Sequence, residues 1–176
     1  MNKTKLVTER LTLAPLNESD KPLFIELCMD PEVMEHCYDP STLEEAEAGF
    51  EAFAQSWDSN SHDWLCFGIT ERNTGDKVGN ISIKILDHKT RAAEVGFLLS
   101  PNKQGRGYAF EALEAVVKFA VTALDIQTLI AICSVNNVSS IKLLEKSGFI
   151  RTALLKNNVV INSEYIDDYR YERAVS

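Results

Sequence analysis

The chain has 176 residues, of which 45% are hydrophobic and 25% charged, and its formal net charge is −8. This composition predicts one globular domain over residues 1–176 and argues against a disordered or membrane-embedded chain. Residues 1–16 lack the apolar stretch of a signal peptide, and no run approaches the ~20 apolar residues of a membrane span. We therefore expect a cytoplasmic protein that binds no membrane.

Nucleic acid is not an expected partner, since phosphate backbones are bound by clustered lysine and arginine. The acidic surface either keeps the protein soluble or attracts cationic acceptors such as amines.

The first third of the chain predicts one strand and two helices. Apolar and polar residues alternate over 6–13 and indicate the strand. A helix is expected to begin at Asn17. Ser41 and Glu44 have the spacing of a capping box, which predicts a second helical region that runs to about Trp57.

Three strands are predicted next, separated by turn-forming residues. Their sequences are WLCFGIT, KVGNISIKIL and RAAEVGFLLS, at 64–70, 77–86 and 91–100, with turns at ERNTGD and DHKT. Such short turns favour an antiparallel meander, which Pro101 ends.

A long helix and a last group of elements complete the chain. Apolar residues recur at helical spacing over 106–124 and indicate an amphipathic helix. The run QTLIAICSV, at 127–135, is typical of a strand buried on both faces. A short helix follows, and Gly148 is expected to end it in the left-handed conformation. Two further strands are predicted around 150–156 and 165–175, so the order of elements indicates an α+β fold.

The cysteines and histidines do not have the spacing of a metal or redox site. Neither a CxxC nor an HExxH pattern occurs, and one cysteine lies inside the apolar run 127–135, where a small thiol packs well. We expect structural cysteines and no metal site. The residues concerned are Cys28, Cys37, Cys66, Cys133, His36, His62 and His88.

The stretch KQGRGYAF, at 103–110, carries two glycines between a predicted strand and the long helix. It is no dinucleotide-binding fingerprint, because Phe110 occupies the third glycine position, and it lacks the Lys-Ser/Thr pair of a P-loop. A small-residue turn at a helix N-terminus can instead hold an anion with backbone N–H groups. Lys103 and Arg106 would add positive charge. The alternative is a plain turn with a solvated basic pair, and the loop alone does not decide between the two.

Three segments together resemble the GNAT superfamily of acyl-CoA-dependent N-acyltransferases, specifically its RimJ/RimL-like branch. QGRGYA, at 104–109, matches the superfamily's pyrophosphate loop Q/R-x-x-G-x-G/A, and the following FEAL is similar to the branch's continuation. AEVGFLLSP, at 93–101, resembles the strand before this loop, and NNVSSIKLLEKSGF, at 136–149, resembles the segment after the next strand. The three segments occur in the family's order and spacing, and the resemblance covers nearly the whole chain.

The resemblance implies a single GNAT domain with an α+β, sandwich-like fold. Its mixed, twisted sheet would have about seven strands with flanking helices, and two strands would splay apart to admit the pantetheine arm of acetyl-CoA. The implied activity is acetyl transfer from acetyl-CoA to a primary amine, with a protein N-terminal α-amine as the leading acceptor. A small-amine acetyltransferase, for a polyamine, amino acid or antibiotic, and a CoA-binding module without catalysis are the alternatives. Oligomeric state is not readable, and a homodimer is one option.

The same resemblance assigns the residues that bind the cosubstrate. The backbone of Phe97, Leu98 and Leu99 would bond the pantetheine, and Asn137 would lie beside the thioester. Gly107 is the glycine that matters most, since a side chain there would hold the phosphate away from the amides. The residues assigned to the pyrophosphate are Gln104, Gly105, Arg106, Gly107, Tyr108 and Ala109.

Glu94 is the candidate general base. On a strand it shares one face with Gly96, which leaves space beside the carboxylate for water or an acceptor. The alternative is an ordinary strand glutamate that forms an ion pair with Arg91 or Lys84.

Ser140 is the second candidate catalytic residue, as a hydrogen-bond donor to the leaving sulfur. Equally, it could cap or pack the first turn of its helix. Many GNAT enzymes have a tyrosine as general acid at the position of Leu144, so tyrosine-acid catalysis is not expected here. The RimJ/RimL-like branch tends to lack that tyrosine, and Glu164 is poorly aligned with the branch's carboxylate base.

The acceptor pocket of this fold is lined by the early helices and the late strands. Aromatic side chains there could surround a cation, or could be ordinary packing residues. Two carboxylates could recognise an amine, or could be polar residues of a strand edge. The aromatic residues are Tyr38, Trp57, Trp64 and Tyr165, and the carboxylates are Asp167 and Asp168.

Overall fold

A computed structural model describes residues 4–176, so the first three residues of the predicted domain lie outside the described range. The described residues form one mixed sheet of eight strands. In chain order these are β1 (Leu6–Val7), β2 (Leu11–Pro15), β3 (Leu65–Glu71), β4 (Lys77–Asp87), β5 (Ala92–Leu99), β6 (Thr128–Ser134), β7 (Ile150–Ile161) and β8 (Glu164–Ala174). Across the sheet the order is β1-β2-β3-β4-β5-β6-β8-β7. The expected mixed α+β fold is confirmed, with eight strands where about seven were expected.

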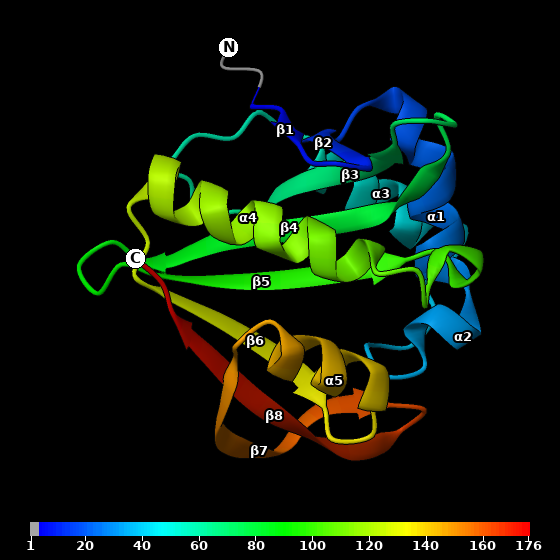
Figure 1. The fold of residues 1–176 in the computed structure, drawn as a ribbon. Helices are drawn as coiled ribbons and strands as arrows, with labels where there is room; N and C mark the ends of the chain where they lie inside the picture. Colours follow the sequence, from blue (N-terminus) through cyan, green and yellow to red (C-terminus); the bar gives the residue numbers. More distant parts are fainter. Residues whose placement is uncertain (1–3) are drawn as a thin grey trace.

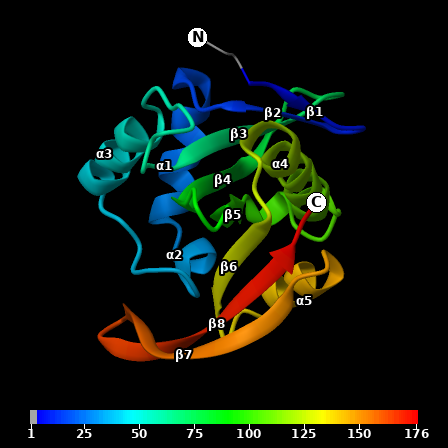
Figure 2. The same ribbon diagram turned by 90° about the vertical axis from the view of Figure 1, so that its left-hand side faces the viewer.

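Helices cover both faces of this sheet (Figure 1). They are α1 (Lys21–Met29), α2 (Pro31–Met34), α3 (Leu43–Phe53), α4 (Tyr108–Leu124) and α5 (Val138–Lys146). Figure 2 shows α1 and α3 on one side of the sheet and α4 and α5 on the other. In the described part of the chain, no helix combines the length and the apolarity that crossing a membrane requires.

The extra strand arises at the N-terminal end, where the predicted single strand over 6–13 is wrong. The chain reverses there, and β1 pairs antiparallel with β2, so that Leu6 lies opposite Leu13. The Thr8 N–H donates to the carbonyl of Leu11 at 2.9 Å, and the Leu11 N–H donates to the Thr8 hydroxyl at 2.9 Å. A threonine side chain that bonds the backbone in this way stabilises a turn, which the alternating pattern could not reveal.

The cap of α3 is one residue later than expected. Thr42, not Ser41, is the N-cap residue, since its hydroxyl accepts from the Glu45 N–H at 3.3 Å and the Glu45 carboxylate accepts from the Thr42 N–H at 2.8 Å. Two overlapping sequences fit the same capping-box pattern, so spacing alone could not choose between them. The helix ends at Phe53, four residues before the predicted Trp57.

The main hydrophobic core lies between the sheet and α4. Val116 and Ala120 of α4 are fully buried with Phe67, Ile81 and Val95 of the central strands, because the apolar stripe of the helix faces the meander. This helix begins at Tyr108, two residues after the predicted start. The antiparallel meander of β3, β4 and β5 is confirmed.

Two neighbouring strands separate in the middle of the sheet. β5 and β6 run parallel and pair at three positions, the last of which joins Glu94 to Ile130. Beyond that point the strands diverge, as Figure 1 shows. The second half of β6 is therefore not covered on both faces, and Ile132 is 39% exposed. The prediction of a strand buried on both faces is correct for Leu129 to Ala131 and fails at Ile132, although Ser134 at the end of the strand is buried again.

Candidate functional site

Two adjoining cavities lie where β5 and β6 diverge. The first, which we call the loop groove, has a volume of about 540 Å³ and is bordered by the end of β5, the stretch 103–110 and α5. The second, the inner cavity, has a volume of about 390 Å³ and extends between β4, β5, β6 and β8. The residues that border both are His36, Cys37, Phe97, Leu98, Asn137 and Ser140. A ligand in the loop groove can thus meet a second molecule in the inner cavity.

The N-terminus of α4 faces the loop groove without a side-chain cap. Gly107 is its N-cap residue, with φ of +81°, and Gly105 also has a positive φ, of +71°. In the described chain, the N–H groups from Gly105 to Phe110 have no hydrogen-bond acceptor. Unpaired first-turn amides and the helix dipole form an anion site, and the positive φ favours glycine at its centre. The residues present therefore fit a pyrophosphate.

The positive charge near the loop differs from the expectation. The Lys103 ammonium already binds Glu71 at 3.1 Å and Asp76 at 2.7 Å, and its side chain is 12% exposed, so its charge is neutralised locally. The side chain of Arg106 is exposed and forms no ion pair with any described residue. Lys146 of α5, which the sequence analysis missed, borders the groove with its ammonium 4.6 Å from the centre of the Phe110 ring.

The other predicted cosubstrate residues also border the loop groove. Phe97, Leu98 and Leu99 end β5 along its side, and the Gln104 amide nitrogen donates to the Leu99 carbonyl at 3.2 Å. Tyr108 is 5% exposed, and its hydroxyl donates to Glu71 at 2.7 Å, away from any ligand. Of these residues, Gln104 and Tyr108 thus use their side chains to hold the protein together, and their backbones are what remain for a ligand.

Asn137 and Ser140 lie at the junction of the two cavities. The side-chain Oδ1 of Asn137 accepts from the Ser140 N–H at 3.1 Å and from the Ser139 hydroxyl at 2.9 Å, so Asn137 caps α5. The alternative in which Ser140 caps this helix is therefore wrong. Ser140 itself borders both cavities.

Glu94 borders the inner cavity on β5. Burial raises the pKa of its carboxyl, and the nearby charges of Lys84 and Arg170 oppose this rise only in part. Within residues 4–176 it forms no ion pair, and Arg91, one of the two suggested partners, binds Asp125 at 3.2 Å. A half-buried carboxylate without an ion pair can accept a proton more readily than an exposed one.

The acidic character of the inner cavity comes from Glu94 and Asp168. Asp168 is 6% exposed, and its carboxylate accepts from the Asn158 side-chain amide at 2.7 Å. Its neighbour Asp167 instead accepts from the Asn157 N–H at 2.8 Å and does not border the cavity. The two aspartates therefore separate into one that faces the cavity and one that holds β7.

Two of the four suggested aromatic residues, Tyr38 and Trp64, border the inner cavity. Trp57 packs against the main core and donates from its indole nitrogen to the Asp63 carbonyl at 3.0 Å, and Tyr165 is 70% exposed. Sequence reasoning missed Asn80 and Ser82 of β4, which border the cavity and are each 7% exposed. It also missed α2, and it gave His36 and Cys37 beside this helix no place in the site. The Asp30-Pro31 pair, an N-cap followed by proline, was the available signal for α2.

Two thiols border the same space. Burial raises the pKa of the Cys37 thiol, and burial together with the charge of Asp168 raises that of Cys133 to about 11. Thiols with raised pKa values carry little thiolate at neutral pH and are poor nucleophiles. All four cysteines are free, and within residues 4–176 no group of His, Cys, Asp or Glu has the arrangement of a metal site.

Comparisons with known proteins agree with this geometry. The family model described as "Acetyltransferase (GNAT) domain" matches residues 10–150. The "Uncharacterized N-acetyltransferase p20" of Bacillus licheniformis is 26% identical over 171 residues, which are 94% of this chain and 93% of that protein. The spermidine N(1)-acetyltransferase of Escherichia coli (strain K12) is also 26% identical, over 87% of this chain and 80% of its own length. The solved complex of RimL, a ribosomal L7/L12 α-N-protein acetyltransferase, with coenzyme A superposes with a TM-score of 0.83 at 20% identity, covering 98% of both chains.

Proposed function

This chain belongs to the GNAT acetyltransferase family, and from that premise we propose that it acetylates protein N-terminal α-amines with acetyl-CoA bound in the loop groove. Acetyl transfer to an amine is the activity of the family, and the loop, acceptor and catalytic residues are the parts that we propose. The observation that carries them is the junction of the two cavities at Phe97, Leu98, Asn137 and Ser140. There a thioester and an amine can meet within one ternary complex, as direct transfer requires.

The loop groove suits coenzyme A from end to end. The amides of Gly105 to Ala109 are available for the pyrophosphate, and the backbone at the end of β5 for the pantetheine. Bound there, acetyl-CoA would supply an already activated acyl group, so that the protein need only orient an amine and let the thiolate leave. RimL, of similar fold, binds coenzyme A according to its solved complex.

Glu94 would take the proton that the attacking amine gives up, and the Ser140 hydroxyl would donate to the departing sulfur. The raised pKa of Glu94 suits this role, because it brings the carboxylate closer to the pKa of an α-amine near 8. Leu144 is 1% exposed at the position where many GNAT enzymes have a tyrosine acid. The raised pKa values of Cys37 and Cys133 argue against a thiol that carries the acetyl group, so direct attack by the amine is favoured.

A small polycationic amine is the second candidate acceptor. It is favoured by the acidic inner cavity, where the carboxylates of Glu94 and Asp168 and the rings of Tyr38 and Trp64 can surround a cation. The spermidine acetyltransferase of Escherichia coli is related to this chain over 87% of the present chain.

We also propose that residues 1–176 act as one domain, in the cytoplasm.

The deciding experiment is a thiol-release assay with acetyl-CoA over two acceptor panels. One panel contains short peptides with free N-termini, and the other contains spermidine, spermine, free amino acids and aminoglycosides. Turnover that is fastest with peptides would support the first acceptor class. Turnover with small amines alone would exclude that class, and tight acetyl-CoA binding without turnover on either panel would contradict both.

A further inference from the structure

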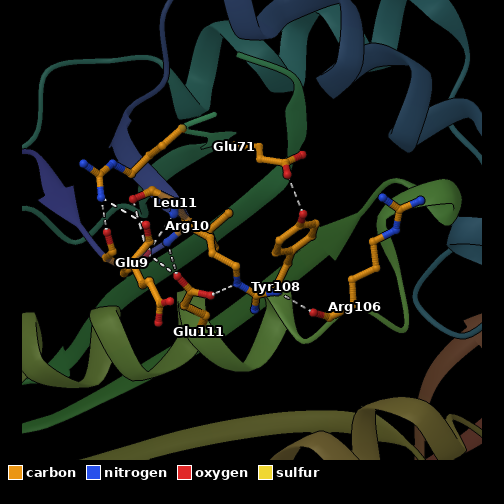
Figure 3. A network of polar contacts seen from close by, with 9 residues as sticks. Glu9, Arg10, Leu11, Glu71, Arg106, Tyr108 and Glu111 are labelled. Atoms are coloured by element: carbon orange, nitrogen blue, oxygen red, sulfur yellow. Dashed lines mark hydrogen bonds and ion pairs between the residues drawn. The ribbon is translucent and has the colours of Figure 1, made fainter. Parts of the chain in front are cut away.

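The turn between β1 and β2 reaches the loop from a distant part of the sequence. One guanidinium nitrogen of Arg10, Nη1, donates to the backbone carbonyl of Arg106 at 2.9 Å. The same guanidinium lies over the Tyr108 ring, 4.7 Å from its centre. Figure 3 shows Arg10 between Glu111 and the start of α4, while the Arg106 side chain points away. Arg10 therefore contacts the backbone of the loop and the first residue of the helix together.

Glu111 holds this guanidinium in place. Its carboxylate accepts from the side-chain Nε of Arg10 at 2.6 Å, from the Arg10 N–H at 2.8 Å and from the Thr8 hydroxyl at 2.5 Å. Burial alone would raise the pKa of Glu111, but these hydrogen bonds and the Arg10 charge hold it below the usual range. The carboxylate thus stays ionised, and Arg10 has little freedom to leave the loop.

A second contact anchors the same loop from β3. The Tyr108 hydroxyl donates to Glu71 at 2.7 Å, and Glu71 also binds the Lys103 ammonium at 3.1 Å. Both ends of the stretch 103–108 are therefore held by side chains. Arg10 acts between them, on the peptide that joins Arg106 to Gly107.

The geometry of a trans peptide gives this contact a direct consequence. The carbonyl and the N–H of one peptide unit lie in one plane and point in opposite directions. Because the Arg106 carbonyl points toward Arg10, the N–H of Gly107 points away from Arg10. Gly107 borders the loop groove on one side and the groove that contains Arg10 on the other.

We propose that Arg10 is a positioning residue for acetyl-CoA: through the Arg106 carbonyl it aims the Gly107 amide at the pyrophosphate, with Glu111 and Thr8 holding the guanidinium. The inference rests on the proposed role of the loop in binding the pyrophosphate. Arg10 acts on the ligand through the loop. If Arg10 only fixed the β1–β2 turn to α4, its contacts would be the same, but its removal would affect acetyl donors with and without a pyrophosphate equally.

The test compares two acetyl donors, acetyl-CoA and acetyl-pantetheine, which lacks the pyrophosphate. Arg10→Met keeps the length of the side chain and removes its donors. We expect KM for acetyl-CoA to rise about ten-fold with kcat nearly unchanged, as for a lost interaction that binds ground state and transition state alike. For acetyl-pantetheine, kcat/KM should stay within about two-fold of the wild-type value, because nothing then depends on the Gly107 amide.

Two further variants make the result specific. Glu111→Gln should raise KM for acetyl-CoA in the same direction but less, and the double variant with Arg10→Met should show less than the product of both effects. The matched control is Arg91→Met, which removes an exposed arginine with one ion pair, to Asp125, at the C-terminal end of α4. It should leave KM and kcat/KM unchanged for both donors.

Each variant is first checked for cooperative thermal unfolding above the assay temperature. An equal loss with both donors, or no loss with acetyl-CoA, would overturn the positioning role. If the wild-type protein itself uses acetyl-pantetheine as well as acetyl-CoA, the pyrophosphate role of the loop fails first, and the positioning role with it.

Discussion

The loop groove and the inner cavity meet at six shared residues, but they are built differently. Most of the residues that we propose to bind acetyl-CoA in the loop groove come from one continuous run, 97–109, and act through the backbone. The inner cavity collects side chains from α2, β4, β5, β6, α5, β7 and β8. Backbone groups cannot be deleted by mutation, so binding in the loop groove should respond to substitutions that add bulk or charge. Function of the inner cavity should respond to the deletion of single side chains.

The largest effect is expected from a side chain added at Gly107. A Cβ there would lie 3.3 Å from Nη2 of Arg10, and a non-glycine residue at φ of +81° is strained. Gly107→Glu should therefore displace the loop amides and add negative charge beside them, so that the Kd for acetyl-CoA rises on the order of 1000-fold. Isothermal calorimetry measures this. Gly75→Glu is the matched control, since Gly75 has φ of +79° and open space around it in the β3–β4 turn. Unchanged affinity in Gly107→Glu would remove the basis for the backbone-built site.

A deletion in the inner cavity should come next. Glu94→Gln should lower kcat about 100-fold at pH 7 through the loss of a general base, while the Kd for acetyl-CoA stays unchanged. The acidic limb of the wild-type pH profile should lie at the raised pKa of Glu94, above its ordinary 4.5, and should vanish in the variant. A variant that keeps both rate and pH profile would exclude Glu94 as the base.

The same variant has a predictable effect on stability. Because burial raises the folded-state pKa of Glu94, its ionised form costs stability, and the contribution of the protonated form is lost as pH rises through that pKa. Glu94→Gln should therefore raise Tm at pH 7 and leave it nearly unchanged at pH 4. Differential scanning calorimetry at the two pH values checks this sign.

A smaller effect is expected from Asp168→Asn. It keeps the shape of the side chain and removes a charge that faces the inner cavity, so KM for a cationic acceptor should rise about ten-fold with kcat largely kept. The adjacent Asp167→Asn is the matched control, because that carboxylate bonds the Asn157 backbone outside the cavity. If both variants behave alike, Asp168 has no specific part in binding the acceptor.

Arg106→Met should give the smallest effect. The Arg106 side chain is exposed, and we propose that the backbone of the loop binds the pyrophosphate. The Kd for acetyl-CoA should therefore rise by only about two- to five-fold, and this rise should be smaller at high salt. Titrations at two salt concentrations measure it. A loss as large as that in Gly107→Glu would mean that side-chain charge, and not the backbone, dominates the loop groove.

The sequence by itself determined the features that depend on neighbouring residues. The meander, the long helix 108–124 and the left-handed Gly148, with φ of +76°, follow from periodicity and glycine chemistry. The loop 104–109 was recognisable because its amides and glycines lie within one short stretch. Family membership followed from the same local patterns.

The tertiary structure alone decided the contacts between distant segments. It showed that Lys103 is already paired, that Thr42 and not Ser41 caps α3, and that Asp168 faces the inner cavity while Asp167 does not. Arg10 and Glu111 are 101 residues apart in sequence, and neither carries a local signal for the other. Local propensity depends on a few adjacent side chains, whereas such contacts depend on how whole elements pack. This is why the sequence offered the stretch 97–109 as one segment, but named only some of the side chains that border the inner cavity and could not separate Asp168 from Asp167.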